Sequence, residues 1–135
     1  MKDLLLKDVS LATVSLSADG TAVGMEFLSL QDGAPCAALQ CRRVILLAFR
    51  NAFEHNKDAF PCYLGEVVRE DLSSSSLRER LDGFQYGFSR GDGSTYMPAG
   101  SRGVHVHLEG GEVILDVICG EAVLVKGTSE VEQEE

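Results

Sequence analysis

The stretch from Gly103 to Val117, GVHVHLEGGEVILDV, constrains the fold more than any other part of this chain. Apolar and polar residues alternate on both sides of Gly110–Gly111, and a period of two places successive side chains on opposite faces of a strand. A Gly-Gly pair favours a two-residue hairpin turn, because both central residues of that turn need positive φ. The sequence therefore predicts an antiparallel β-hairpin here.

The predicted register of this hairpin sorts its side chains onto two faces. Around a turn at Gly110–Gly111, the cross-strand partners are Glu109 with Glu112, His107 with Ile114, and His105 with Asp116. One face is wholly apolar and is predicted to lie in the core: Val104, Val106, Leu108, Val113, Leu115 and Val117. The other face surrounds Ile114 with ionisable residues: His105, His107, Glu109, Glu112 and Asp116.

The ionisable face permits three interpretations. Histidines at i and i+2 stand roughly 7 Å apart on one strand face, so both can reach one ion. The candidate zinc or iron ligands are His105, His107, Glu109 and Glu112. A second interpretation is an acid–base pair of His105 and Asp116. The favoured interpretation is a solvated sheet face without metal, cofactor or catalytic residue, because antiparallel sheets commonly show one wet face.

Strand patterns also occupy most of the remaining chain. A first hairpin runs from Val9 to Leu30, with a break at Ala12–Thr13 and a turn at Asp19–Gly20. Further strands are predicted after Pro61 and at 84–88. Residues 122–125 are apolar on both faces, and a strand covered on both sides suits a sandwich, a curved sheet or a dimer contact. We expect a mainly β fold, a sandwich or partly open barrel of about seven to nine antiparallel strands.

Two segments show helical signals. Residues 36–53 combine an apolar run of strand length, predicted here as a strand from Leu39 to Phe49, with helix-forming residues at helical spacing. The alternative is therefore an α+β fold with a helix near 36–53. Ser76 and Glu79 fit a capping box for a short helix that ends at Gly83, with Leu77 and Leu81 one turn apart.

Length and charge limit the functional classes. The 135 residues carry a formal charge of −9, and we expect one domain over 1–127 with a disordered acidic tail over 128–135. An acidic chain is a poor ligand for nucleic acid or anionic membranes. No apolar run approaches the roughly 20 residues that span a bilayer, and the N-terminus lacks the pattern of a signal peptide. We therefore expect a cytoplasmic protein with four reduced cysteines buried in its core.

Four segments of this chain resemble several small bacterial β-rich families of unassigned function. They are the opening hairpin KDVSLATVSLSADGTAVGMEFLSL, the apolar LQCRRVILLAF, the segment YLGEVV and the final VHVHLEGGEVILDVICGEAVLV. Some of these families are assigned as toxin-immunity proteins. The resemblance implies a non-catalytic module that binds another protein, and the acidic surface suits a basic partner such as a cationic toxin domain. A homodimer is a further expectation.

About twenty residues also resemble the first motif of the cupin family. Gly100, His105, His107, Glu112 and Gly120 stand in for the motif's positions, with spacings that differ by one residue at both glycine ends. The resemblance implies that His105, His107 and Glu112 bind a metal in a cupin-like barrel, either as a metal-binding protein or as a metalloenzyme. The second cupin motif is expected some twenty residues after Gly120, whereas fifteen residues of this sequence follow that glycine.

Overall fold

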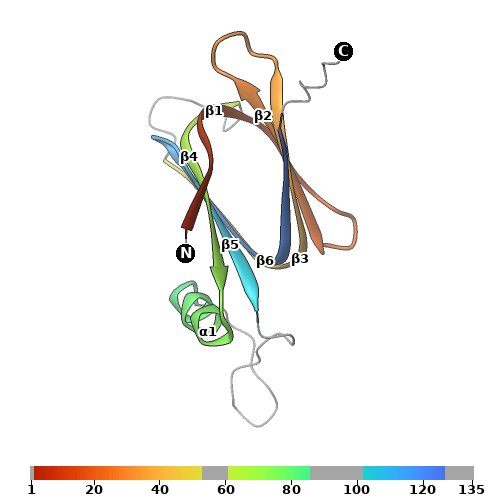
Figure 1. The fold of residues 1–135 in the computed structure, drawn as a ribbon, viewed down its shortest axis with the longest axis vertical. Helices are drawn as coiled ribbons and strands as arrows, with labels where there is room; N and C mark the ends of the chain where they lie inside the picture. The colour runs from red at the N-terminus through yellow and green to blue at the C-terminus, as the bar shows by residue number, and fades with distance from the viewer. Residues whose placement is uncertain (1, 53–60, 86–101, 127–135) are drawn as a thin grey trace.

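The protein folds around one antiparallel sheet that closes on itself (Figure 1). The structure is a computed structural model that describes residues 2–52, 61–85 and 102–126. Its elements in chain order are β1 (Lys2–Leu16), β2 (Ala22–Ser29), β3 (Pro35–Asn51), β4 (Cys62–Leu72), α1 (Ser74–Gly83), β5 (Gly103–Glu109) and β6 (Val113–Lys126). The mainly β prediction is confirmed.

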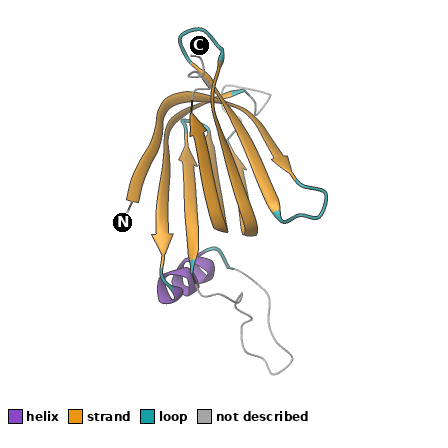
Figure 2. Cartoon of the chain, turned by 45° about the vertical axis from the view of Figure 1, so that its right-hand side comes forward, coloured by secondary structure: helices purple, strands orange, loops and turns teal. Residues whose placement is uncertain are grey.

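The strands form a closed barrel in the order β1-β2-β3-β6-β5-β4 (Figure 2). Three long strands, β1, β3 and β6, each take part in two sections of this barrel. In the section that we call the β2 half, residues 9–16 of β1, β2, residues 35–42 of β3 and residues 121–126 of β6 lie side by side. In the β5 half, β4 and β5 lie between residues 2–11 of β1 and the remaining parts of β6 and β3.

Irregularities in the long strands explain why the described residues hold six strands and not seven to nine. The pairing register shifts between Leu11 and Thr13 in β1, where the sequence pattern breaks, and between Val44 and Leu46 in β3. Arg43 adopts a positive φ of 54° at the second site. A bulge bends and twists a strand without ending it. Each long strand therefore passes from one half of the barrel to the other, and the predicted sandwich form is replaced by a closed ring.

Residues 36–51 are strand, so the alternative helix near 36–53 is wrong for the described part of that range. Ala37, Leu39 and Cys41 are buried, whereas Ala38 and Gln40 between them are exposed. This period of two places every second side chain in the barrel interior. The helix-forming composition is overridden because β2 and β6 pair with the segment on both sides.

The barrel interior is the hydrophobic core. All six strands contribute alternate side chains to one cluster of buried residues, which includes Phe27, Leu64, Val106 and Leu115, each at most 1% exposed. The six apolar residues predicted for the core face of the β5–β6 hairpin all belong to this cluster. That prediction is confirmed, and these side chains fill the centre of the barrel.

Helix α1 packs against the outside of the β5 half near one end of the barrel (Figure 1). Leu77 and Leu81 are buried in a second cluster with Leu72 and Ile118. The predicted helix is confirmed, but it begins earlier than the capping box at Ser76 indicated. Ser73 is the N-cap, and its hydroxyl accepts a hydrogen bond from the Ser76 amide.

Some predicted features fall outside the described residues. They are the acidic tail over 128–135, most of the strand predicted over 84–88, and Gly100 of the cupin-like motif. Phe84, at the start of that predicted strand, is described and is the C-cap of α1 instead. Within the described residues, no helix is long and apolar enough to cross a membrane.

Candidate functional site

The β5–β6 hairpin forms as predicted, with a different register. His107 pairs with Asp116, Glu109 with Ile114, and His105 with Ile118. The Gly110 amide donates to the Val113 carbonyl at 2.9 Å, so the turn is centred on Gly111 and Glu112. Each partner differs by two residues from the predicted one. A shift of two leaves every side chain on its predicted face, because strand side chains alternate with that period.

The position of β4 accounts for the altered turn. A Cβ atom on Gly110 would overlap the backbone carbonyl of Tyr63 in β4. The positive-φ glycines among the described residues are Gly20 and Gly33, so the turn is not the type that the Gly-Gly pair favours. Gly110 is required for close contact with a neighbouring strand, which the local sequence could not indicate.

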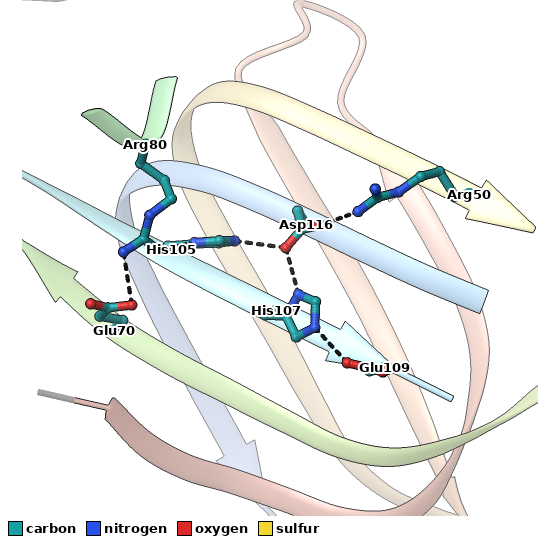
Figure 3. A network of polar contacts seen from close by, with 7 residues as sticks. All are labelled: Arg50, Glu70, Arg80, His105, His107, Glu109 and Asp116. Atoms are coloured by element: carbon teal, nitrogen blue, oxygen red, sulfur yellow. Dashed lines mark hydrogen bonds and ion pairs between the residues drawn. The ribbon is translucent and has the colours of Figure 1, made fainter. Parts of the chain in front are cut away.

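Asp116 lies at the centre of a polar cluster on the outer surface of the β5 half (Figure 3). Its side chain is only 2% exposed. The Oδ1 atom accepts hydrogen bonds from His105 Nε2 at 2.7 Å and from His107 Nδ1 at 2.6 Å. The Oδ2 atom accepts from an Arg50 amino group at 2.9 Å. Three donors from two strands, β5 and β3, therefore converge on one buried carboxylate.

The partners of His105 determine which of its nitrogens holds the proton. An Arg80 amino group lies 2.5 Å from Nδ1. A guanidinium can only donate, so Nδ1 is the acceptor and Nε2 holds the proton that it donates to Asp116. The His105 ring is 9% exposed, with Phe84 edge-on at a centroid distance of 5.8 Å.

His107 differs because both of its nitrogens meet carboxylates. Nδ1 bonds to Asp116, and Nε2 lies 2.9 Å from Glu109 Oε1. Burial acts to lower the pKa of His107, but the hydrogen bonds to Asp116 and Glu109 outweigh it and raise the pKa. Two acceptors require two N–H groups, so the geometry and the pKa direction both indicate an imidazolium.

The cluster is balanced in charge. Burial acts to raise the pKa of Asp116, but the hydrogen bonds from His105 and His107 outweigh it and lower the pKa, so this carboxylate stays ionised. Arg80 also forms an ion pair with Glu70 at 3.1 Å. The cluster therefore holds three carboxylates, Asp116, Glu70 and Glu109, and three cations, Arg50, Arg80 and His107.

Sequence reasoning placed only part of this cluster. It identified the ionisable face and four of its members: His105, His107, Glu109 and Asp116. Glu112, a predicted ligand, lies in the turn instead. Arg50, Glu70 and Arg80 were missed. They come from β3, β4 and α1, and no local pattern marks them as neighbours of the hairpin.

The donor set fits a metal ion only in part. His105, His107 and Asp116 each offer a ligand atom, and these atoms lie within 4.8 Å of one another. A histidine that binds metal through Nε2 has its proton on Nδ1 and donates it to an acceptor. At His105 that proton would face the Arg80 guanidinium, which is itself a donor. His107 has a suitable acceptor in Glu109, but His105 does not.

The cupin-like interpretation gains no support from the geometry. His105 and His107 lie on the outside of the barrel, whereas the alternate residues Val104, Val106 and Leu108 fill the interior. A pocket of about 250 Å³ does adjoin the cluster, between Lys2, Glu66, Val68 and Glu70. It is an open surface pocket and not the interior of the barrel.

A second feature of the β5 half is an acidic patch beside an exposed tyrosine. Glu66 in β4 pairs directly with Glu109 in β5, so two carboxylates lie side by side on the outer surface. The Tyr63 ring is 50% exposed, and its hydroxyl donates to Asp8 at 2.5 Å. We call Asp8, Tyr63, Glu66 and Glu109 the acidic patch.

The outer surface of the β2 half has a different character. A groove of about 710 Å³ runs across β1, β2, β3 and β6. Val123 and Val125 border it and are 41% and 58% exposed. We call this surface the β2 face.

The cysteines are free thiols. Cys41, Cys62 and Cys119 are buried in the barrel interior, as expected, and Cys36 is partly exposed. The hydrogen bond that the Cys41 thiol donates to Cys119 and the burial of Cys41 both raise the pKa of Cys41, so this thiol is protonated at neutral pH.

The fold and the site together define a small antiparallel β-barrel with a packed interior and a charge-balanced polar cluster on its outside. A protein-family model, described only as "-like", matches residues 4–126. The chain belongs to that family.

Two further comparisons complete the picture. No curated protein matches the chain. A crystal structure described as that of an uncharacterized protein from Neisseria gonorrhoeae is similar, with a TM-score of 0.61 over 92% of this chain and 96% of that one. The two sequences are 14% identical. The likeness therefore shows a shared fold.

Proposed function

We propose that this protein is a non-catalytic module that binds a basic protein partner. Two features of the described residues support a binding role over a catalytic one. The barrel interior is filled by apolar side chains. The polar cluster around Asp116 uses its hydrogen-bonding groups on itself, and its charges are balanced. Both features stabilise the barrel, and neither presents a reactive group.

The observation on which the proposal rests is the acidic patch. Like charges directly opposite each other on adjacent strands destabilise a sheet. Glu66 and Glu109 have this arrangement. Lys7 of β1 lies opposite Glu66 and His107 bonds to Glu109, so part of the repulsion is offset within the chain. A cationic side chain that a partner places between the two carboxylates would offset the rest. Tyr63 adds an exposed aromatic ring next to the carboxylates. Tyrosine is enriched among the residues that dominate binding energy at interfaces.

The net charge of the molecule fits the same partner. A charge of −9 attracts cationic proteins over distances of about 10 Å and accelerates their association at low salt. The resemblance to toxin-immunity families implies one such partner, a cationic toxin domain. The proposal requires only that the partner be basic.

Affinity capture followed by titration tests the proposal. The full chain is immobilised, proteins from the source cells are loaded at low salt, and retained proteins are eluted with a salt gradient and identified by mass spectrometry. The purified partner is then titrated against wild type and against Glu66→Gln/Glu109→Gln. We expect the double variant to bind at least about tenfold more weakly, because each lost charge contact at an interface commonly costs about 1 kcal/mol or more.

The matched control is Glu26→Gln/Glu121→Gln, which removes the same charge from the β2 face. We expect it to bind within about twofold of wild type, since the affinity should depend on the acidic patch and not on net charge alone. The proposal fails if no basic protein is retained, or if the two double variants bind equally.

A further inference from the structure

His107 connects the buried polar cluster to the acidic patch (Figure 3). Its Nδ1 atom lies 2.6 Å from Asp116 Oδ1, and its Nε2 atom lies 2.9 Å from Glu109 Oε1. Asp116 is the centre of the cluster, whereas Glu109 also belongs to the acidic patch, where it pairs with Glu66 of β4. A change at His107 therefore reaches a carboxylate that the proposed partner would contact.

The two carboxylates that His107 joins differ in their access to water. The Asp116 side chain is 2% exposed, and the Glu109 side chain is 52% exposed. A buried carboxylate that loses a hydrogen-bond donor incurs its full desolvation penalty, whereas an exposed one is hydrated instead. When the imidazolium loses one proton to the solvent, Nδ1 therefore keeps its hydrogen for Asp116, and Nε2 is the atom that loses one.

Loss of that proton makes the contact between His107 and Glu109 repulsive. A neutral imidazole has one N–H group and one acceptor nitrogen, so the Nε2 lone pair would face Glu109 Oε1 across 2.9 Å. Two acceptors at this distance repel each other. The exposed Glu109 carboxylate then turns into solvent beside Glu66, and the acidic patch gains one unit of uncompensated negative charge.

The other charges around His107 do not replace the imidazolium. They come from each element packed against it and are Lys2 of β1, Arg50 of β3, Glu66 and Glu70 of β4, Arg80 of α1, His105 and Glu109 of β5, and Asp116 of β6. Arg50 bonds to Asp116, and Arg80 bonds to Glu70. Lys2 lies opposite Glu70 in the sheet. Among the described residues, His107 is the one cation hydrogen-bonded to Glu109.

We infer that the protonation state of His107 regulates binding of a basic partner to the acidic patch. The inference rests on the proposed function and adds its regulation. The doubly protonated ring holds Glu109 and weakens binding, and the singly protonated ring releases Glu109 and strengthens it. The pKa of His107 is raised above its usual 6.5, so the weakly binding state predominates below that value. Affinity therefore rises as pH increases through the folded-state pKa.

Calorimetric titration at two pH values tests the inference. The ligands are an N-acetylated hexalysine peptide and the captured basic partner, each at about pH 6 and about pH 8.5 in the same low salt. Lysine side chains titrate near pH 10.4, so the peptide keeps its charge across this range. We expect wild type to bind about fivefold more tightly at the higher pH, which is the effect of one unit charge about 4 Å away in water.

Three variants assign the pH dependence. His107→Gln should bind equally at both pH values, with about the wild-type affinity at the higher pH, because an amide gains no proton. Glu109→Gln keeps the histidine but removes the carboxylate that it releases, so the difference should fall below about twofold. His55→Gln is the matched control, since it removes a histidine from a distant part of the sequence, and it should keep the whole difference.

Thermodynamic linkage provides a second readout. If hexalysine binds better to the singly protonated ring, saturating peptide has to lower the pKa of His107 by the same factor by which deprotonation raises the affinity. Titration of the imidazole by NMR, with and without peptide, measures this pKa. A histidine that only stabilises the barrel would show the same pKa in both samples.

The regulation and the proposed function fail in different ways. Equal wild-type affinity at both pH values overturns the regulation and leaves the proposed function standing. A pH difference that persists in His107→Gln, or a His107 pKa that saturating peptide leaves unchanged, also overturns the regulation. If neither hexalysine nor any captured basic protein binds at either pH, the proposed function is wrong, and the regulation is wrong with it.

Discussion

Asp116 holds a buried negative charge that His105, His107 and Arg50 share. Replacing one member of a buried charge network lowers stability more than replacing the whole network with apolar residues, because the remaining charges are left without compensation. We expect Asp116→Asn to lower the free energy of unfolding by about 3 kcal/mol, measured by urea denaturation. Asp71→Asn is the control, since Asp71 is exposed, and should cost less than about 1 kcal/mol. Equal losses would show that the cluster does not contribute to stability.

The pH dependence of stability follows from the pKa directions of two residues. The pKa of His107 is raised above 6.5, so its stabilising contribution is complete below that value and is lost as pH rises through the folded-state pKa. The pKa of Asp116 is lowered below 3.8, so its contribution is present above that value and is lost as pH falls through the folded-state pKa.

We therefore expect the unfolding free energy to have a plateau at mildly acidic to neutral pH and to fall on both sides. Urea titrations across pH measure it, with His107→Gln as the comparison. The variant should lose the alkaline decline and keep the acidic one. An unchanged alkaline decline in this variant would assign that decline to another group.

The orientation of Arg80 leads to a third expectation at this scale. Because its guanidinium faces His105 Nδ1, a metal at Nε2 would leave two donors facing each other. We expect one equivalent of zinc to leave the thermal midpoint of the protein unchanged, as measured by calorimetry. One equivalent of zinc or iron in protein purified without chelator, lost in His105→Ala/His107→Ala, would contradict this expectation.

At the scale of elements, the β5–β6 hairpin shows what a local pattern can and cannot determine. The two faces were predictable because they depend only on the period of two. The exact partners were not, because Tyr63 of β4 decides where the turn lies. The same limit applies to the polar cluster. Its histidines and Asp116 lie on one hairpin, but Arg50 and Arg80 reach it from β3 and α1.

Gly110 and Gly111 offer a direct test of that account. A Cβ on Gly110 would overlap the Tyr63 carbonyl, whereas a Cβ on Gly111 would meet nothing within 4 Å. We expect Gly110→Ala to cost about 3 kcal/mol through backbone displacement, and Gly111→Ala to change stability by less than about 0.5 kcal/mol. Chemical denaturation of both variants measures the difference. Equal costs would instead indicate the turn with two positive-φ glycines that the sequence suggested.

At the scale of the whole molecule, two apolar clusters differ in how much of the fold they support. Phe27 lies in the barrel interior with residues from every strand, whereas Leu81 lies in the smaller cluster beneath α1. Both are fully buried. We expect Phe27→Ala to lower global stability by about 4 kcal/mol, and Leu81→Ala to open mainly α1. Hydrogen exchange measured by mass spectrometry distinguishes them. Faster exchange in all strands of Leu81→Ala would show that the helix is integral to the barrel.

The closed ring also determines how the chain must assemble. β1 pairs with β4, and β3 pairs with β6, so the ring joins strands from distant parts of the sequence. Only the β1–β2, β2–β3 and β5–β6 contacts are local hairpins. Loop-closure entropy has to be overcome before distant strands can gain from pairing. Folding of such a topology falls in the millisecond-to-second range typical of β-rich domains. A newly made chain exposes its apolar strands until β6, the last of the strands in the described residues, has been synthesised and joins β3 to β5.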